Sequence, residues 1–81
     1  MKSKLNQITQ PQYRGIRILL EWCVRHLKES TTQEERIRWK ANVEFVAKIQ
    51  RGQFYNKEEQ LQLNRLRYER INEQTNKRYN L

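Results

Sequence analysis

Apolar residues recur with helical spacing in the first third of the chain. At about 100° per residue, most apolar residues between positions 10 and 29 fall on one helix face, and charged residues occupy the opposite face. This apolar face comprises Tyr13, Ile16, Leu19, Leu20, Cys23, Val24 and Leu27. Thr9 and Gln12 form a T-x-x-Q capping box, and Pro11 suits a first helical turn. The pattern predicts an amphipathic helix over 10–29.

A second helix is expected over residues 32–51. Two capping boxes are available for its start, Thr31 with Glu34 and Thr32 with Glu35. Gly52 is expected to follow its end as the C′ residue, because glycine adopts the left-handed conformation that closes many helices. The apolar residues of this segment spread around much of the helix, which indicates a central helix packed on two neighbours.

A third helix is expected over residues 57–74. Asn56 is its predicted N-cap, and Glu58 and Glu59 complement the positive end of the helix dipole. Its apolar stripe is thin, so the residues from Thr75 to Leu81 are interpreted as a polar tail.

These elements predict an all-α fold, a small three-helix bundle with short connections. A chain of 81 residues with one proline and two glycines supports a single domain, 1–81, with one small core. Short connections make consecutive helices antiparallel or steeply crossed neighbours. The segment from Lys2 to Ile8 is expected to be a flexible basic N-terminal arm.

Charge is the strongest feature of the composition. Seventeen Lys and Arg residues face nine Glu and no Asp, which gives a formal net charge of +8. Ten of the cations are Arg, whose planar guanidinium suits two-point contact with phosphate or carboxylate. Such a surplus favours a polyanionic partner, either nucleic acid or an acidic protein surface.

The sequence gives no sign of export or membrane insertion. No apolar run approaches the roughly 20 residues that a membrane span needs, and the N-terminus has no apolar stretch typical of a signal peptide. The single cysteine cannot form an internal disulfide, which suits a reducing compartment. A cytoplasmic protein is therefore expected.

The sequence predicts no catalytic residues, no metal site and no cofactor. Cys23 and His26 are three residues apart, but Cys23 points into the apolar face, where a thiol is inert. Paired glutamates occur only in predicted first helical turns, and no phosphate-binding loop or zinc-ligand pattern is present. The protein is expected not to be an enzyme.

Two groups of cations are candidate nucleic-acid-binding residues. The first group is Arg14, Arg17, Arg25 and Lys28, and the second is Arg65, Arg67, Arg70, Lys77 and Arg78. Arg and Lys bind phosphates, and aromatic residues among them stack on unpaired bases. They predict a small accessory protein that contacts the backbone of DNA or RNA. A solvated face, salt-bridged through Glu21, is the alternative for the first group.

Aromatic and apolar residues outside the main stripe suggest a different function. The candidate partner-binding residues are Ile18, Trp22, Phe54, Tyr55 and Tyr68. Protein interfaces are enriched in aromatic residues and Arg. The alternative function is a non-enzymatic adaptor or inhibitor that docks on a larger protein, by analogy with phage or mobile-element accessory and anti-defence proteins. Coverage of this patch by the third helix, and a homodimer through that helix, remain open.

Overall fold

The computed structural model describes the backbone of residues 5–79 and the side chains of residues 5–77. The chain is an all-α protein with three helices, and two very short strands flank the first and third. In chain order the elements are β1 (Asn6–Gln7), α1 (Gln10–Glu29), α2 (Gln33–Gly52), β2 (Phe54–Tyr55) and α3 (Lys57–Tyr79).

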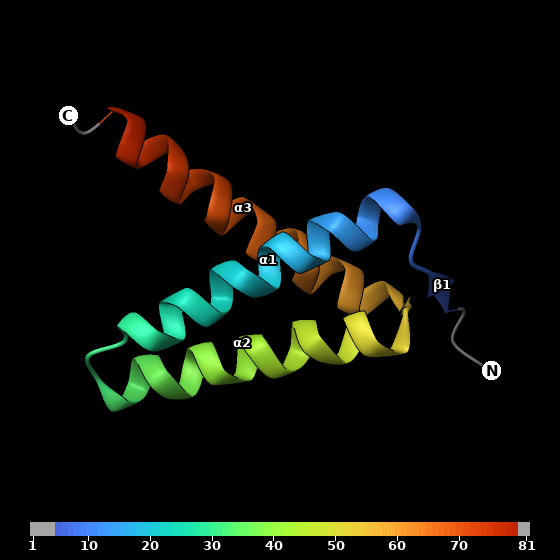
Figure 1. The fold of residues 1–81 in the computed structure, drawn as a ribbon, viewed down its shortest axis with the longest axis horizontal. Helices are drawn as coiled ribbons and strands as arrows, with labels where there is room; N and C mark the ends of the chain where they lie inside the picture. The colour runs from blue at the N-terminus through green and yellow to red at the C-terminus, as the bar shows by residue number, and fades with distance from the viewer. Residues whose placement is uncertain (1–4, 80–81) are drawn as a thin grey trace.

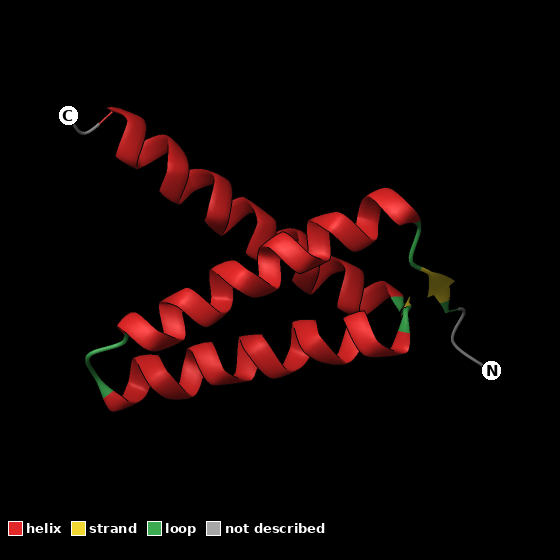
Figure 2. Ribbon diagram, in the orientation of Figure 1, coloured by secondary structure: helices red, strands yellow, loops and turns green. Residues whose placement is uncertain are grey.

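The helices α1 and α2 form an antiparallel hairpin, and α3 crosses α1 (Figures 1 and 2). Along the crossing, α3 runs in the same general direction as α1. Its C-terminal half then diverges from the hairpin, so that the end of α3 lies far from the α2 helix in this view. This divergence leaves a groove between α3 and the hairpin, described below.

Side-chain caps fix the start of each helix. Reciprocal hydrogen bonds join Thr9 with Gln12 at α1 and Asn56 with Glu59 at α3. At α2 the structure selects one of the two predicted caps, because the Glu35 backbone N–H donates to the Thr32 hydroxyl at 3.1 Å. The Thr31 backbone N–H donates to the Glu35 carboxylate at 3.3 Å. Caps satisfy N–H groups that have no partner within the helix.

The end of α2 differs from the prediction. Gly52 is the last helical residue, and Gln53 adopts the left-handed conformation with φ 60° and ψ 17°. The Gln53 backbone N–H donates to the Ile49 carbonyl oxygen at 2.8 Å, which closes the helix. The expectation that Gly52 is the C′ residue is therefore wrong by one position, because α2 continues one residue further than its glycine suggested.

The N-terminal segment is also more ordered than expected. Asn6 and Gln7 pair antiparallel with Tyr55 and Phe54, in that register. The Ile8 backbone N–H adds a hydrogen bond of 2.9 Å to the Gln53 carbonyl oxygen. Backbone pairing therefore fixes this part of the predicted flexible arm against the α2–α3 connection, whereas Lys2 and Lys4 lie outside the described residues.

The third helix is longer than predicted. It continues past Gln74 to Tyr79, through residues interpreted from sequence as a tail. Within this extension the Lys77 ammonium lies 3.2 Å from the Glu73 carboxylate, an i,i+4 pair that stabilises a helix. Glu73 also binds α1, which attaches this part of α3 to the rest of the molecule.

All three helices contribute to one hydrophobic core. The buried residues are Ile16, Leu19, Trp22, Cys23, Trp39, Val46, Ile49, Tyr55, Leu63 and Leu66. Other apolar residues of α3, such as Leu61 and Ile71, are exposed, in agreement with the thin apolar stripe of this helix in the sequence. None of the helices in the described part of the chain has the length and apolar character required to cross a bilayer.

Candidate functional site

The first cationic group lies along the solvent face of α1. Arg14, Arg17, Arg25 and Lys28 are all exposed. The Arg17 Nε atom lies 3.5 Å from the Glu21 carboxylate, and both side chains are exposed. An exposed i,i+4 pair of this kind is weak, so Arg17 can exchange Glu21 for another anion at low cost. In the described part of the chain, the other three cations of this group form no ion pair.

The second cationic group does not form one surface. At about 100° per residue, Arg65 and Arg67 point about 160° apart on α3. Arg65 is exposed, whereas Arg67 is half-buried with a guanidinium nitrogen 3.9 Å from the position that a Cβ atom on Gly15 would take. Arg67 therefore lies against α1.

The remaining members of the second group also differ from one another. Arg70 is half-buried and, among described side chains, forms no ion pair. Lys77 is exposed but pairs with Glu73. The side chain of Arg78 lies outside the described residues.

The candidate partner-binding residues divide into exposed and buried members. Ile18, Phe54 and Tyr68 are exposed. Trp22 and Tyr55 are only 7% and 8% exposed, so neither offers an accessible surface to a partner. The prediction that Trp22 and Tyr55 lie on a docking surface is therefore wrong.

Packing explains why these two aromatic residues are buried. Helix α3 covers Trp22, and the strand β2 turns the Tyr55 ring into the core. The Tyr55 hydroxyl then accepts a hydrogen bond of 3.2 Å from the Gln12 side-chain amide. Both residues therefore stabilise the fold. For Trp22 this corresponds to the alternative in which the third helix covers the apolar patch.

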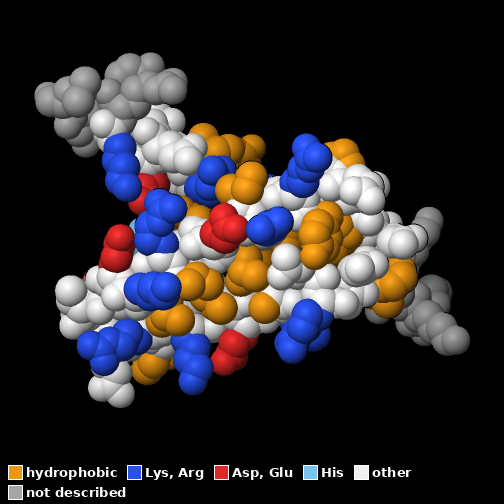
Figure 3. Space-filling model, viewed as in Figure 1, with side chains coloured by type: hydrophobic (Ala, Val, Ile, Leu, Met, Phe, Trp, Pro, Cys, Tyr) orange, Lys and Arg blue, Asp and Glu red, His pale blue; other side chains and the backbone are white. Residues whose placement is uncertain are grey.

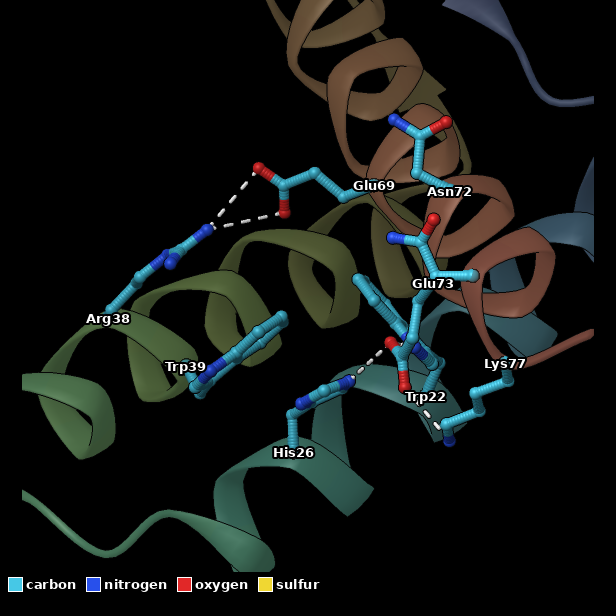
Figure 4. A pocket seen from close by; sticks show the side chains of 9 residues that line it. Trp22, His26, Arg38, Trp39, Glu69, Asn72, Glu73 and Lys77 are labelled. Atoms are coloured by element: carbon cyan, nitrogen blue, oxygen red, sulfur yellow. Dashed lines mark hydrogen bonds and ion pairs between the residues drawn. The ribbon is translucent and has the colours of Figure 1, made fainter. Parts of the chain in front are cut away.

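The diverging half of α3 leaves a groove of about 680 Å³ against the hairpin (Figure 4). Residues of all three helices line it: Trp22, His26, Arg38, Trp39, Glu69, Asn72, Glu73, Asn76 and Lys77. Figure 4 shows Trp22 and His26 projecting from α1 toward Glu73 of α3, with Trp39 of α2 beside them.

Aromatic rings form one wall of this groove. The His26 ring stacks on Trp39 with centroids 4.3 Å apart and planes 14° apart. Trp22 meets Trp39 edge-on at 5.1 Å. The Arg38 guanidinium lies 5.3 Å from the Trp39 ring centre, within cation–π range, and its Nη2 atom is 3.3 Å from a Glu69 oxygen.

Glu73 is the acceptor that joins these groups. Its Oε2 atom accepts a 2.7 Å hydrogen bond from the Trp22 indole N–H and lies 2.7 Å from His26 Nε2. Burial alone would raise the pKa of Glu73, but hydrogen bonds from His26, Trp22 and Lys77 outweigh it and lower the pKa below the ordinary 4.5. An ionised carboxylate only accepts hydrogen bonds, so His26 Nε2 carries a proton.

The side chains that line the groove are best described as a structural cluster. Each of its two carboxylates is already paired, Glu69 with Arg38 and Glu73 with three donors. Cys23, beneath this wall, is fully buried, and burial followed by the charge of Glu69 raises the pKa of its thiol to about 11. A nucleophilic cysteine needs a lowered pKa, whereas the pKa of Cys23 is raised.

Sequence reasoning did not identify this cluster. Trp22 and Glu73 are separated by 51 positions, and His26 and Glu73 by 47. No spacing rule links residues so far apart. Among the described residues, no group of three or more His, Cys, Asp or Glu side chains is arranged to hold a metal ion.

A second hollow lies on the side of α3. It has a volume of about 370 Å³ and is lined by Asn64, Arg67, Tyr68 and Ile71. The sequence identifies Arg67 and Tyr68 as candidate site residues, but not Asn64 or Ile71. The signal that places all four together is their i, i+3, i+4, i+7 spacing, which defines one helix face.

Comparison with known proteins gives this arrangement no relatives. No protein-family model matches the chain, and no curated protein or solved structure shows significant similarity to it.

Proposed function

We propose that this protein is a small, non-enzymatic accessory protein that binds nucleic acid through its Arg and Lys side chains. The contacts are mainly to the phosphate backbone, and the partner is DNA or RNA. The buried, protonated Cys23 and the fully engaged Glu73 support binding rather than catalysis. A free thiol fits a reducing compartment, so the proposed location is the cytoplasm.

The observation that carries this proposal is the set of exposed and half-buried cations without acidic partners. Among described side chains, the candidate cations that form no ion pair are Arg14, Arg25, Lys28, Arg65, Arg67 and Arg70. The nine glutamates can neutralise at most nine of the seventeen cations, so a surplus of eight positive charges remains, and the ion pairs show which cations contribute to it. Figure 3 shows Lys and Arg side chains spread over one face of the molecule, with Glu side chains among them.

The cations of α1 have a spacing that suits a backbone contact. Arg14 and Lys28 are about 21 Å apart along the helix axis at 1.5 Å per residue. Duplex DNA carries one phosphate charge per roughly 1.7 Å of axis. A helix laid along the backbone therefore meets several phosphates, and long Arg and Lys side chains adjust to their positions without a fixed sequence being read.

A salt series tests the proposal directly. Labelled duplex DNA, single-stranded DNA and RNA are titrated with the full chain from about 50 to 300 mM salt, and binding is followed by fluorescence anisotropy. Phosphate contact predicts a linear fall of log affinity with log salt concentration, because bound counterions are released. No binding to any of the three at low salt contradicts the proposal, and so does a slope near zero.

Charge-reversal variants locate the surface. Arg14→Glu with Arg25→Glu lowers the net charge from +8 to +4, since each reversal subtracts two charges. Lys40→Glu with Lys48→Glu, on the exposed side of α2, makes the same change in net charge and serves as the matched control. The α1 pair is expected to weaken binding about 10-fold more than the control and to reduce the salt slope by about 1.5–2. Equal effects would show that only net charge matters.

A non-enzymatic adaptor or inhibitor is the second candidate. The observation that favours it is exposed apolar area away from the core, including Ile18 on α1 and Phe54 on β2. Docking on an acidic protein predicts a stoichiometric complex that Ile18→Ala or Phe54→Ala weakens more than any single Arg substitution. Isothermal titration against a candidate partner would measure both effects.

A further inference from the structure

The hollow on α3 lined by Asn64, Arg67, Tyr68 and Ile71 has the composition of a base-binding site. Its volume of about 370 Å³ lies within the range of small-ligand sites, about 300–1,000 Å³. We infer that this hollow binds an unpaired base of a single-stranded nucleic acid, an inference that rests on the proposed function. The protein then prefers single strands to duplexes of the same sequence.

The apolar part of the hollow is unusually accessible. Tyr68 is 68% exposed and Ile71 is 52% exposed, and both lie within the helix α3. The Tyr68 hydroxyl has no hydrogen-bond partner among described residues, so the ring is free to take a new neighbour. A planar base stacked on the ring removes apolar surface of both partners from water, and it does so for any base.

The polar part of the hollow matches the rest of a nucleotide. Asn64 offers both an amide donor and a carbonyl acceptor to a base edge. Arg67 supplies a positive charge for the adjoining phosphate, and its half-buried side chain lies close to α1 at Gly15. The four lining residues include no carboxylate. The larger groove differs in this respect, because Glu69 and Glu73 in its lining repel phosphate.

Helix α1 passes close to Arg67, on one side of the hollow. A guanidinium nitrogen of Arg67 lies 3.9 Å from the position that a Cβ atom on Gly15 would take, and the two helices run in the same general direction where they cross (Figure 1). Arg14, next to Gly15 in the chain, is exposed, so a strand that extends from the hollow toward α1 meets a further positive charge.

This combination favours a single strand over a duplex. In a duplex the bases are stacked inside and phosphates cover the outside, so the exposed Tyr68 and Ile71 side chains would meet charged groups. A single strand presents base faces and phosphates side by side. Loss of a base–aromatic stack typically weakens such binding about 5- to 150-fold.

The test compares Tyr68→Ala with Leu61→Ala on the full chain. Leu61 lies on the same helix and is 61% exposed, but it does not line the hollow, so it controls for loss of exposed apolar area. Binding of labelled single strands of about 15 nucleotides, and of the duplex of the same sequence, is measured by anisotropy at one salt concentration. Circular dichroism confirms that each variant is folded.

The wild type is expected to bind the single strand more tightly than the duplex. Tyr68→Ala should weaken single-strand binding about 10-fold, leave duplex binding and the salt slope unchanged, and be rescued by Tyr68→Phe. Equal affinities of Tyr68→Ala and Leu61→Ala for the single strand would overturn the inference while leaving phosphate binding intact. Absence of all binding would overturn the proposed function as well. A change from dimer to monomer in Tyr68→Ala, seen by sedimentation, would assign the hollow to self-association instead.

Discussion

Two adjacent residues at the end of α2, Gly52 and Gln53, each have a backbone conformation that the other residue type would favour. Gly52 is helical and has open space where a Cβ atom would be, whereas Gln53 takes the left-handed conformation at φ 60°. Helical glycine lowers stability relative to alanine, and a non-glycine residue is strained in the left-handed region. Each of Gly52→Ala and Gln53→Gly is therefore expected to raise the free energy of unfolding by about 0.5–1 kcal/mol.

Urea denaturation followed by circular dichroism measures both changes. The sign for Gly52→Ala is the informative one. If Gly52 occupied the C′ position, as its place in the sequence suggests, alanine there would destabilise the protein by about 1 kcal/mol. A destabilised Gly52→Ala together with an unchanged Gln53→Gly would contradict the observed end of α2.

Among the described side chains, Glu73 is the one in the diverging half of α3 that forms hydrogen bonds with α1. Replacing it with Gln keeps the shape but removes the charge, and the amide NH2 group then faces donors in either orientation, Trp22 and His26 in one and Lys77 in the other. Glu73→Gln is expected to lower the free energy of unfolding by about 1–2 kcal/mol, since hydrogen bonds to charged groups contribute about 1.5–3 kcal/mol and this one is partly exposed. Glu21→Gln, which breaks only an exposed surface pair, should change it by less than about 0.5 kcal/mol.

Comparison of the wild type with Glu73→Gln also predicts how the stabilisation by Glu73 changes with pH. The pKa of Glu73 is lower in the folded protein than its ordinary value of 4.5, so folding favours the ionised form. The resulting stability is complete above pH 4.5 and is lost as the pH falls through the folded pKa. The difference in unfolding free energy between wild type and Glu73→Gln should therefore narrow at acid pH. A difference that is constant from neutral to acid pH would contradict the role of the carboxylate.

At the scale of whole elements, the sequence predicts what local chemistry determines. Helix starts were identifiable because a cap and its partner are three residues apart, as with Asn56 and Glu59. The all-α class follows from the same signals together with the apolar face of α1. These features depend on neighbours in the chain, so no knowledge of the tertiary structure was needed.

The remaining features depend on contacts between distant segments. The pairing of β1 with β2 brings together residues about 50 positions apart, and neither two-residue strand has a pattern of its own. The burial of Trp22 depends on where α3 crosses α1 and on Glu73, which the spacing of apolar residues does not specify. The second cationic group was divided because residues two positions apart on a helix point in different directions, as Arg65 and Arg67 do.

The strand β2 offers a test of the packing at this connection. Phe54 and Tyr55 are adjacent aromatic residues, but only Tyr55 is buried. Tyr55→Ala is expected to lower the free energy of unfolding by about 3–5 kcal/mol, a large part of the total for a domain of this size, whereas Phe54→Ala should lower it by less than about 1 kcal/mol. Urea midpoints measure both. Similar losses of unfolding free energy for the two variants would contradict the assignment of Tyr55 to the side of β2 that faces the core.

For the molecule as a whole, Cys23 is a built-in probe of cooperative opening. It lies at the centre of the core that all three helices share and is fully buried. Its pKa of about 11, against an ordinary 9.0, alone reduces the thiolate fraction near neutral pH about 100-fold, and a folded core also excludes the reagent. Alkylation of the native protein at about pH 8 is therefore expected to be at least 100-fold slower than in denaturing urea.

The same labelling distinguishes a single cooperative core from local opening. The Glu73→Gln variant weakens the attachment of α3. If Cys23 becomes accessible only when the whole core opens, the logarithm of its labelling rate should rise in proportion to the loss of unfolding free energy, about 10-fold in rate for each 1.4 kcal/mol. Mass spectrometry of the alkylated chain over time measures the rate. Labelling of the native wild type at the unfolded rate would mean that α3 does not close over the hairpin, and the position of Arg67 against α1 would then not be fixed.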